Sequence, residues 1–394
     1  MAADATRPGN LTGIAGAIAT ITAVGIGLSL GIPLLAVVME QRGIPGTLIG
    51  LNSAMAGIAS ILIAPLVARV LSRVSAAPLA FASVVVAAAT FPGFWLIDDI
   101  TWWFPLRILF HGAVTSAFIV SEYWIVALAP ERRRGLVMGV YSTLLSLGFA
   151  AGPILLGLLG SEGPWPFFIG AAIMASASLP VLLAWNRTPQ RHEAVAPRFM
   201  RTLFAVPTAT LAGFVFGFVE SGEFAFLPIY GLRSGMQEAA AAALVTAIAL
   251  GGIVFLVPIG MLADRVDRHV ILAFCAAAGA AGIALLPLAI GAPLSAYALL
   301  FVYGGITGSI YTVGLVHLGA RMAPGELASA NAVFVFMYSL GMLTGPASLG
   351  VAIDLWNPTG VPALLTLMLA AYAAFVIVRR LRIPDRRPEV GAEP

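Results

Sequence analysis

Two stretches of this sequence repeat one another: SLGFAAGPILLG, Ser146–Gly157, and SLGMLTGPASLG, Ser339–Gly350. Both follow the pattern Ser-Leu-Gly-x-x-x-Gly-Pro-x-x-x-Gly. Small residues four apart let two helices approach closely, and a proline inside a helix removes one backbone donor and bends the helix. The repeat therefore predicts two related halves built from closely packed helices. The predicted packing positions are Gly139, Gly148, Gly152, Pro153 and Gly157 in the first half, and Gly341, Gly345, Pro346 and Gly350 in the second.

The composition around these repeats is that of a membrane protein. Hydrophobic residues make up 60% of the 394 positions and charged residues only 10%, whereas a soluble domain has about a quarter of its residues charged. Apolar stretches long enough to cross a hydrocarbon core of about 30 Å recur along the whole chain. We therefore predict an all-α membrane protein with twelve transmembrane helices in two pseudo-symmetric six-helix halves. The spans are expected at residues 12–39, 46–67, 77–97, 102–128, 136–159, 165–185, 203–231, 238–262, 270–290, 293–317, 327–350 and 360–378.

The arginines predict how the chain is oriented. All 21 basic residues are arginine, and eighteen of them fall on one side of the membrane if the N-terminus lies on that side. Only Arg42 and Arg233 fall opposite, and Arg107 lies within a span. Loops rich in arginine stay in the cytoplasm, so both termini are predicted to be cytoplasmic in a multi-pass protein of the cell (inner or plasma) membrane. Five tryptophans are expected to form an aromatic belt at the outer boundary: Trp95, Trp102, Trp103, Trp165 and Trp356.

A polar segment between the sixth and seventh spans divides the chain. It reads NRTPQRHEAVAPRFMRT and is the longest polar interruption in the sequence. The predicted domains are therefore an N-terminal six-helix half (1–185), a cytoplasmic linker (186–202) and a C-terminal six-helix half with a basic C-terminal tail (203–394). Repeated halves around a central site are typical of secondary transporters.

The stretch FVESGEFAF, Phe218–Phe226, places two glutamates in an otherwise apolar span. With Glu122 they are the three acidic residues predicted to lie inside the membrane, where a charge costs about 2.5 to 3.5 kcal/mol. Glu220 and Glu223 are expected one turn apart on one helix face. Like charges there discourage simultaneous ionisation, so at least one is expected to be protonated at rest. Such a carboxyl can carry a proton or hold a cation, and the alternative role is a structural hydrogen bond between helices.

A second polar stripe is predicted on the fourth span. Arg107, His111 and Glu122 lie within about 60° of one another around a helix. Arg107 lies near the outer end, where it could snorkel, whereas Glu122 lies below the midplane. The stripe suggests a polar path in the N-terminal half, with His111 as a possible proton relay. An ion pair between Arg107 and a carboxylate that stabilises the bundle is the alternative.

The segment GMLADRVDRH after the eighth span carries the most specific motif. Its Gly260-x-x-x-Asp264-Arg265-x-x-Arg268 spacing resembles the signature loop of the major facilitator superfamily, and the resemblance covers nearly the whole chain. The resemblance implies that Asp264 faces the N-terminal end of the eleventh helix, where the helix dipole favours an anion, and acts as a gating latch. A loop that merely solvates this end of the helices is the alternative.

Two further segments resemble parts of the same family. The fifth span, from Gly139 to Gly157, resembles the family's antiporter motif. The segment SEYWIVALAPERRRG, which begins at Ser121, resembles the YcaD-like efflux branch. These resemblances imply export in exchange for protons, whereas ordinary glycine-mediated packing is the alternative role of the fifth span.

The resulting hypothesis is a secondary active transporter working by alternating access. It is expected to be a proton-coupled antiporter that exports small organic compounds, amphipathic or weakly cationic, and to act as a monomer in the lipid bilayer. A proton symporter that takes up a small metabolite is the alternative, and a cavity lined by Arg107 and His111 would favour this alternative with an anionic substrate. No cofactor other than the coupling proton, no metal, no nucleic acid and no enzymatic activity are expected, because no catalytic, metal-ligand or nucleotide-binding spacing occurs.

Overall fold

The computed structural model describes residues 8–130, 133–189, 203, 206–263, 265–322 and 327–382. The linker core and the basic C-terminal tail predicted above lie outside the described residues. Within them, twelve helical segments are long and apolar enough to cross a membrane, so the predicted number of spans is confirmed. The helices are α1 (Pro8–Gln41), α2 (Gly46–Leu71), α3 (Ala76–Thr90), α4 (Gly93–Leu96), α5 (Trp103–Leu128), α6 (Arg134–Leu159), α7 (Trp165–Ser176), α8 (Ser178–Leu183), α10 (Pro207–Arg233), α11 (Glu238–Ala263), α12 (Arg268–Ala289), α13 (Pro293–Gly319), α14 (Leu327–Leu355) and α15 (Gly360–Arg382).

Two of the predicted spans are interrupted. The third consists of α3 and α4, and the sixth of α7 and α8. Pro92 follows α3, and Pro180 lies just after the break at Ala177. A proline has no N–H to donate to the residue four positions earlier, and its ring crowds that carbonyl, so the helix is broken near it.

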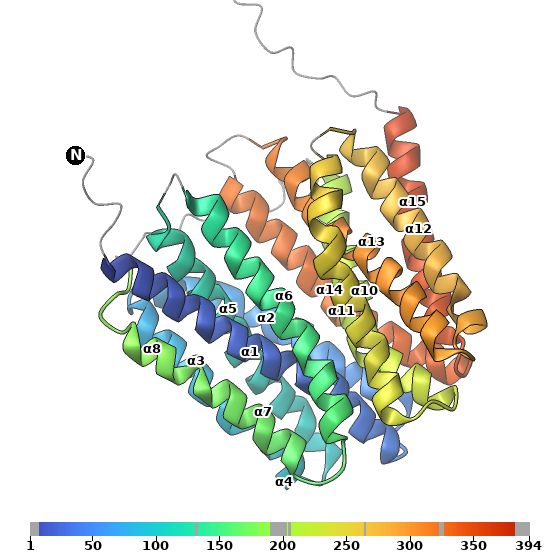
Figure 1. The fold of residues 1–394 in the computed structure, drawn as a ribbon, viewed down its shortest axis with the longest axis horizontal. Helices are drawn as coiled ribbons and strands as arrows, with labels where there is room; N and C mark the ends of the chain where they lie inside the picture. The colour runs from blue at the N-terminus through green and yellow to red at the C-terminus, as the bar shows by residue number, and fades with distance from the viewer. Residues whose placement is uncertain are drawn as a thin grey trace, which may run out of the picture.

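Packing within the two halves follows one plan. α1 packs on α6 as α10 packs on α14, and α2 packs on α5 as α11 packs on α13. The N-terminal half, blue to green, and the C-terminal half, yellow to red, lie on opposite sides of the molecule (Figure 1). The structural repeat therefore matches the repeated glycine pattern of α6 and α14.

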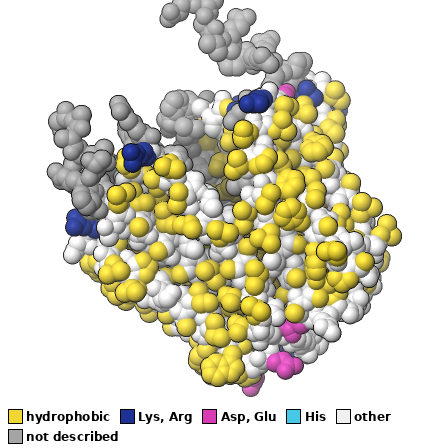
Figure 2. Space-filling view, viewed as in Figure 1, with side chains coloured by type: hydrophobic (Ala, Val, Ile, Leu, Met, Phe, Trp, Pro, Cys, Tyr) yellow, Lys and Arg dark blue, Asp and Glu magenta, His cyan; other side chains and the backbone are white. Residues whose placement is uncertain are grey.

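Contacts between the halves involve mainly six helices. α2 packs on α14 and α6 on α11, with α1 on α10 between them. We call the end of the bundle that holds the start of α1 and the end of α15 the proximal end, and the opposite end the distal end. Figure 2 shows a broad hydrophobic band, with arginines toward the proximal end and most Asp and Glu at the distal end. This is the charge distribution expected of a protein embedded in a bilayer.

The glycines of the repeat lie where backbones touch. A Cβ on Gly152 would lie 2.3 Å from the backbone nitrogen of Leu30 on α1, and one on Gly345 would lie 2.2 Å from the carbonyl oxygen of Phe218 on α10. Gly350 approaches Gly46 of α2 in the same way, at 2.2 Å from its carbonyl oxygen. In contrast, a Cβ on Gly139, toward the proximal end of α6, would meet nothing within 4 Å. Along α6, the close approach to α1 is therefore made at Gly152 and not at Gly139.

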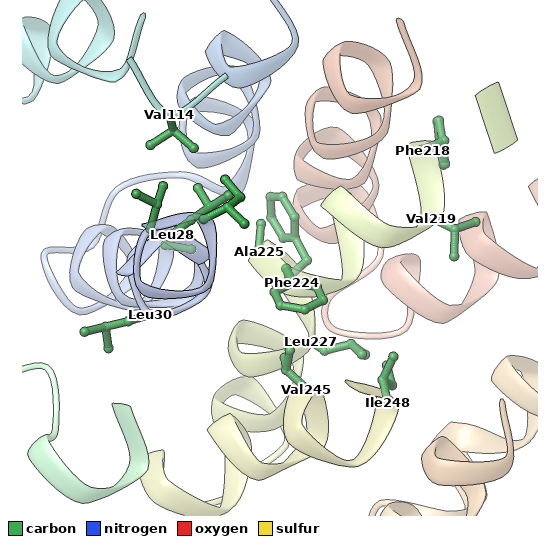
Figure 3. Close-up of a cluster of buried hydrophobic side chains, with 14 of the residues drawn as sticks. Leu28, Leu30, Val114, Phe218, Val219, Phe224, Ala225, Leu227, Val245 and Ile248 are labelled. Atoms are coloured by element: carbon green, nitrogen blue, oxygen red, sulfur yellow. The ribbon is translucent and has the colours of Figure 1, made fainter. Parts of the chain in front are cut away.

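Hydrophobic side chains fill the space between α1 and α10. Figure 3 shows Phe224 of α10 on the side facing α1 and Leu28, while Leu227, Val245 and Ile248 gather where α10 packs on α11. Phe224 also meets the ring of Phe149 on α6, with ring centres 6.1 Å apart. This contact joins the two halves near the middle of the bundle.

Candidate functional site

The two glutamates of α10 point to different neighbours. The Tyr338 hydroxyl on α14 donates to Glu220 Oε2 at 2.5 Å, and Glu220 is half-buried. The Tyr303 hydroxyl on α13 donates to Glu223 Oε1, and Glu223 is only 2% exposed. The two carboxylates are close enough to interact electrostatically. The Glu220 carboxyl is therefore partly accessible from outside the helix bundle, whereas Glu223 is enclosed between helices.

Glu122 brings a third carboxylate to the middle of the molecule from the other half. It is exposed, although it lies within α5, and accepts a hydrogen bond of 2.7 Å from the hydroxyl of buried Tyr141 on α6. Tyr311 of α13 is close enough to interact electrostatically with both Glu122 and Glu220. One tyrosine of the C-terminal half is therefore near carboxylates of both halves.

Aromatic rings surround Tyr311. Its ring centre lies 5.2 Å from that of Phe216, 5.1 Å from that of Phe334 and 5.9 Å from that of Tyr338. The rings of Phe216 and Tyr338 are stacked, with centres 6.0 Å apart. Phe216, Tyr311 and Tyr338 are half-buried, so part of each remains accessible. Aromatic faces beside carboxylates attract organic cations, and flat apolar groups stack on them.

The structure does not bring Arg107 and His111 together with Glu122. Both lie near the distal end of α5 and are buried, at 1% and 4% exposure, and the apolar Val114 and Phe118 lie between them and Glu122. The expectation that Arg107 snorkels is wrong, because its side chain is buried within the protein. Trp103, one turn before it on α5, packs on Phe94. Trp103 is itself fully buried and is not part of an aromatic belt.

Charged side chains join the halves at the distal end. Arg233, at the end of α10, donates to both carboxylate oxygens of Glu40 on α1, at 2.7 and 2.9 Å. Asp354, at the end of α14, accepts from the backbone nitrogens of Gly46 and Thr47 at 2.9 and 2.7 Å. Ser161 lies 2.9 Å from both Gln41 and Glu238. All three sets link the N-terminal half to the C-terminal half, so the distal end is closed.

The signature loop is only partly described. Asp264 lies outside the described residues, so the structure offers no view of the predicted latch. Arg265 is exposed and Arg268 half-buried, and a Cβ on Gly260 would meet nothing within 4 Å. Asp267 next to them accepts from the His269 backbone nitrogen at 2.7 Å and lies 3.6 Å from Arg380 Nε.

Sequence reasoning missed two aromatic residues of the site. Tyr141 is the one tyrosine in the span 136–159, and this polar hydroxyl in an apolar span is a signal that could have found it. Phe216 carries no such signal, because phenylalanine is common in lipid-facing and core positions alike. No cluster of three potential metal-ligating side chains occurs among the residues that the structure describes.

Comparison with known proteins gives the family. The family model of the Major Facilitator Superfamily matches residues 17–249 and 234–394. An uncharacterized transporter of this type, YfkF of Bacillus subtilis, is 25% identical over 88% of this chain and 90% of its own length. Another uncharacterized one from Yersinia pestis is 25% identical over 75% of this chain and 76% of its own.

Two solved structures share the fold. A variant of the nucleoside transporter NupG superposes with a TM-score of 0.76 at 16% identity and covers 96% of this chain and 100% of its own. A bacterial homologue of the human lysosomal transporter Spinster, in an inward-facing conformation, superposes with a TM-score of 0.72 at 15% identity, over 95% and 96%. The chain therefore belongs to the Major Facilitator Superfamily and is a multi-pass secondary transporter, not an enzyme.

Proposed function

We propose that this transporter is a proton-coupled antiporter that exports small organic compounds, amphipathic or weakly cationic. In this proposal the termini lie in the cytoplasm, the distal end faces outward, and the structure corresponds to the state closed to the outside. The 18 arginines predicted on the terminal side support this orientation. The likeness to an inward-facing Spinster homologue agrees with it.

The observation that carries the proposal is that Tyr311 lies beside Tyr338, the partner of Glu220, and near Glu122 of the other half. A cationic or flat substrate can stack on the rings of Phe216, Tyr311 and Tyr338 and be attracted by both carboxylates. Because the carboxylates come from opposite halves, the substrate would be released when the halves move relative to each other. The site draws on both halves of one chain, which supports a monomer as the working unit.

The proton has a place in the same site. A cation next to Glu220 favours its ionised form, so substrate binding and protonation compete for one carboxylate. Glu223, enclosed with Tyr303 and electrostatically coupled to Glu220, can retain a proton while Glu220 exchanges. This competition is what proton-substrate antiport requires.

Two sequence resemblances support export. The glycine-rich α6 resembles the antiporter motif, and its Gly152 packs directly on the backbone of α1. A tight seam here would limit proton leakage during exchange. The same proposal assigns the chain to the YcaD-like branch. It also gives Asp264 the role of the latch that holds the outward-open state.

Proton-coupled uptake of an anionic metabolite is the second candidate. Arg107 favours it, because within the described residues its guanidinium has no carboxylate partner. Its position, 15 residues from Glu122 along α5, sets it apart from the aromatic site, and this favours antiport.

Purified protein in liposomes with an imposed pH gradient tests the proposal. A fluorescent aromatic cation such as ethidium serves as the transported probe, and a pH-sensitive dye reports protons. Glu220→Gln and the double change with Glu223→Gln are expected to abolish coupled flux. Glu162→Gln, a change at an exposed distal glutamate, is the control and should transport normally.

Two outcomes would count against the proposal. Coupled flux that persists in the double variant removes the role of the glutamates. Movement of substrate and protons in the same direction rules out antiport and supports the symporter.

A further inference from the structure

The environment of Arg107 lacks a negative charge. The side chain is 1% exposed, and among the described residues one hydrogen bond joins it to another side chain, from Nη2 to Ser53 Oγ on α2 at 3.4 Å. Nε and Nη1 are buried and have no hydrogen-bond partner among the described residues. Burying a charge is strongly unfavourable unless it is paired and hydrogen-bonded. A group that accepts from these two donors would remove most of that cost.

The acids within the spans cannot supply that group in this structure. Glu122 is bonded to Tyr141, Glu220 to Tyr338 and Glu223 to Tyr303. Glu122 lies on the same helix as Arg107 but 15 residues further on, which is about 22 Å along the axis. The predicted ion pair between Arg107 and a carboxylate is therefore absent among the described residues.

Two neighbouring side chains also have unpartnered polar atoms. His111 Nδ1 lies 3.2 Å from the carbonyl oxygen of Arg107, which can only accept, so Nδ1 carries the proton of this bond and Nε2 is left unpartnered. Asn52, which precedes Ser53, is 0% exposed, and both its amide nitrogen and its amide oxygen lack partners. Orphaned polar atoms are rare in folded proteins, and here they occur on residues next to the same contact between α2 and α5.

We propose that Arg107 and Ser53, with Asn52 beside them, form a binding site for a small monovalent anion. The guanidinium supplies one fixed positive charge and two unpartnered donor nitrogens, Nε and Nη1. The Ser53 hydroxyl and the Asn52 amide nitrogen are further donors. One negative charge neutralises the arginine, whereas a divalent anion would leave an uncompensated charge in a buried place. Chloride and the carboxylate of a small solute share this chemistry.

The position of the site ties anion binding to the closure of the distal end. Ser53 lies on α2 between Gly50 and Gly57, and a Cβ on these glycines would lie 2.2 and 2.5 Å from backbone atoms of Pro346 and Leu343 on α14. Residues 50, 53 and 57 share one face of α2, so the proposed site adjoins the seam between α2 and α14. When this seam opens, the site becomes accessible from the distal end, so the anion enters and leaves from that side.

Thermal unfolding of the full chain in detergent tests the site. Chloride replaces isethionate, a bulky monovalent anion, at constant ionic strength, and a parallel series uses acetate. A ligand that binds only the folded protein raises the unfolding midpoint in a saturable way. We expect such a rise of a few degrees in the unchanged protein and its loss in Arg107→Gln. The control is Arg42→Gln, because Arg42 is exposed at the same end of the molecule, over the Trp103 ring, and should keep the rise.

Each outcome decides for or against the site. A rise with chloride identifies an inorganic anion, and a rise with acetate alone identifies a carboxylate. No saturable rise with either anion, or an equal rise in Arg107→Gln, overturns the proposal. If Arg107→Gln does not fold, Ser53→Ala is used instead, together with binding of radiolabelled chloride and acetate to the unchanged protein, whose absence for both would also overturn it. None of these results depends on which substrate is transported or on its coupling to protons.

Discussion

Asp354 at the end of α14 accepts hydrogen bonds from the first two backbone nitrogens of α2, those of Gly46 and Thr47. The Thr47 hydroxyl donates to the same carboxylate at 2.8 Å. The unsatisfied N–H groups and the positive end of the helix dipole make a helix start a good place for a carboxylate. Here the carboxylate and the helix belong to different halves, so this cap holds the distal end closed.

Replacing Asp354 separates the roles of the cap and the charge. Asp354→Ala removes both and should weaken distal closure by about 1 kcal/mol. This lowers the ratio of distally closed to distally open molecules about fivefold. Asp354→Asn keeps the capping oxygen and should have a smaller effect. The measurement is the distance between spin labels at Leu96 and Leu294, which are exposed distal positions in opposite halves. The population of longer distances should increase slightly in Asp354→Asn and more in Asp354→Ala. An unchanged distribution in Asp354→Ala would show that the cap does not hold the closed state.

The glycines predict a contrast between two kinds of packing. Gly50 of α2 would place a Cβ 2.2 Å from the carbonyl oxygen of Pro346, in the seam between the halves. Gly50→Ala should therefore open the distal end, while the fold of each half persists. Gly345→Ala, which lies within the C-terminal half, should lower the unfolding midpoint, because overpacking costs typically about 1 to 3 kcal/mol.

A matched control for these changes is Gly139→Ala. This glycine has nothing within 4 Å of its would-be Cβ, so the variant should be neutral or slightly more stable, since alanine is the better helix former. Thermal unfolding and the same spin-label distances distinguish the three variants. Equal effects in all three would mean that close approach is not the reason for glycine at these positions.

The pair of Glu40 and Arg233 predicts a measurable coupling across the halves. Their side chains are 18% and 17% exposed and form a bidentate contact, a geometry in which an ion pair contributes more than a fully exposed one. A double-mutant cycle with Glu40→Gln and Arg233→Gln should give a coupling of about 1 kcal/mol in the unfolding free energy. Additive effects of the two changes would show that the pair contributes nothing to stability.

Asp267 predicts how the proximal end responds to acid. Partial burial opposes its ionisation, but bonds from the backbone nitrogens of His269 and Val270 and the charges of His269 and Arg380 prevail and lower its pKa below the usual 3.8. A lowered pKa in the folded state gives stability that is present above the unfolded pKa and is lost as the pH falls through the folded one. The unchanged protein should therefore lose stability below about pH 4 more steeply than Asp267→Asn. Unfolding midpoints measured between neutral and acid pH test this, and parallel curves would contradict it.

The number and position of the spans follow from the sequence because hydropathy and length are local properties. The breaks at Pro92 and Ala177 were not predicted, although the prolines near them were visible, because membrane helices often keep a proline without a break. Pro153 and Pro346, for example, lie inside continuous helices.

The site was harder to predict because it depends on which helix covers each side chain. Glu220 and Glu223 are neighbours on α10, yet their partners lie on α14 and α13, and no local pattern tells these two apart. Arg107 lies one turn from the start of α5, which in isolation indicates snorkelling. Its burial depends on neighbouring helices such as α2, which supplies its partner Ser53, and is a property of the tertiary fold.

Along the seam between α2 and α14, Gly50 and Gly350 bring main chain directly against main chain. At these two positions no side chain has to change its rotamer when the helices part. The glycine surfaces can separate and rejoin as rigid bodies, and the bonds of Asp354 to the first turn of α2 add to the forces that resist the separation. A contact of this kind lets a small number of bonds at its edge influence how fast the transporter turns over.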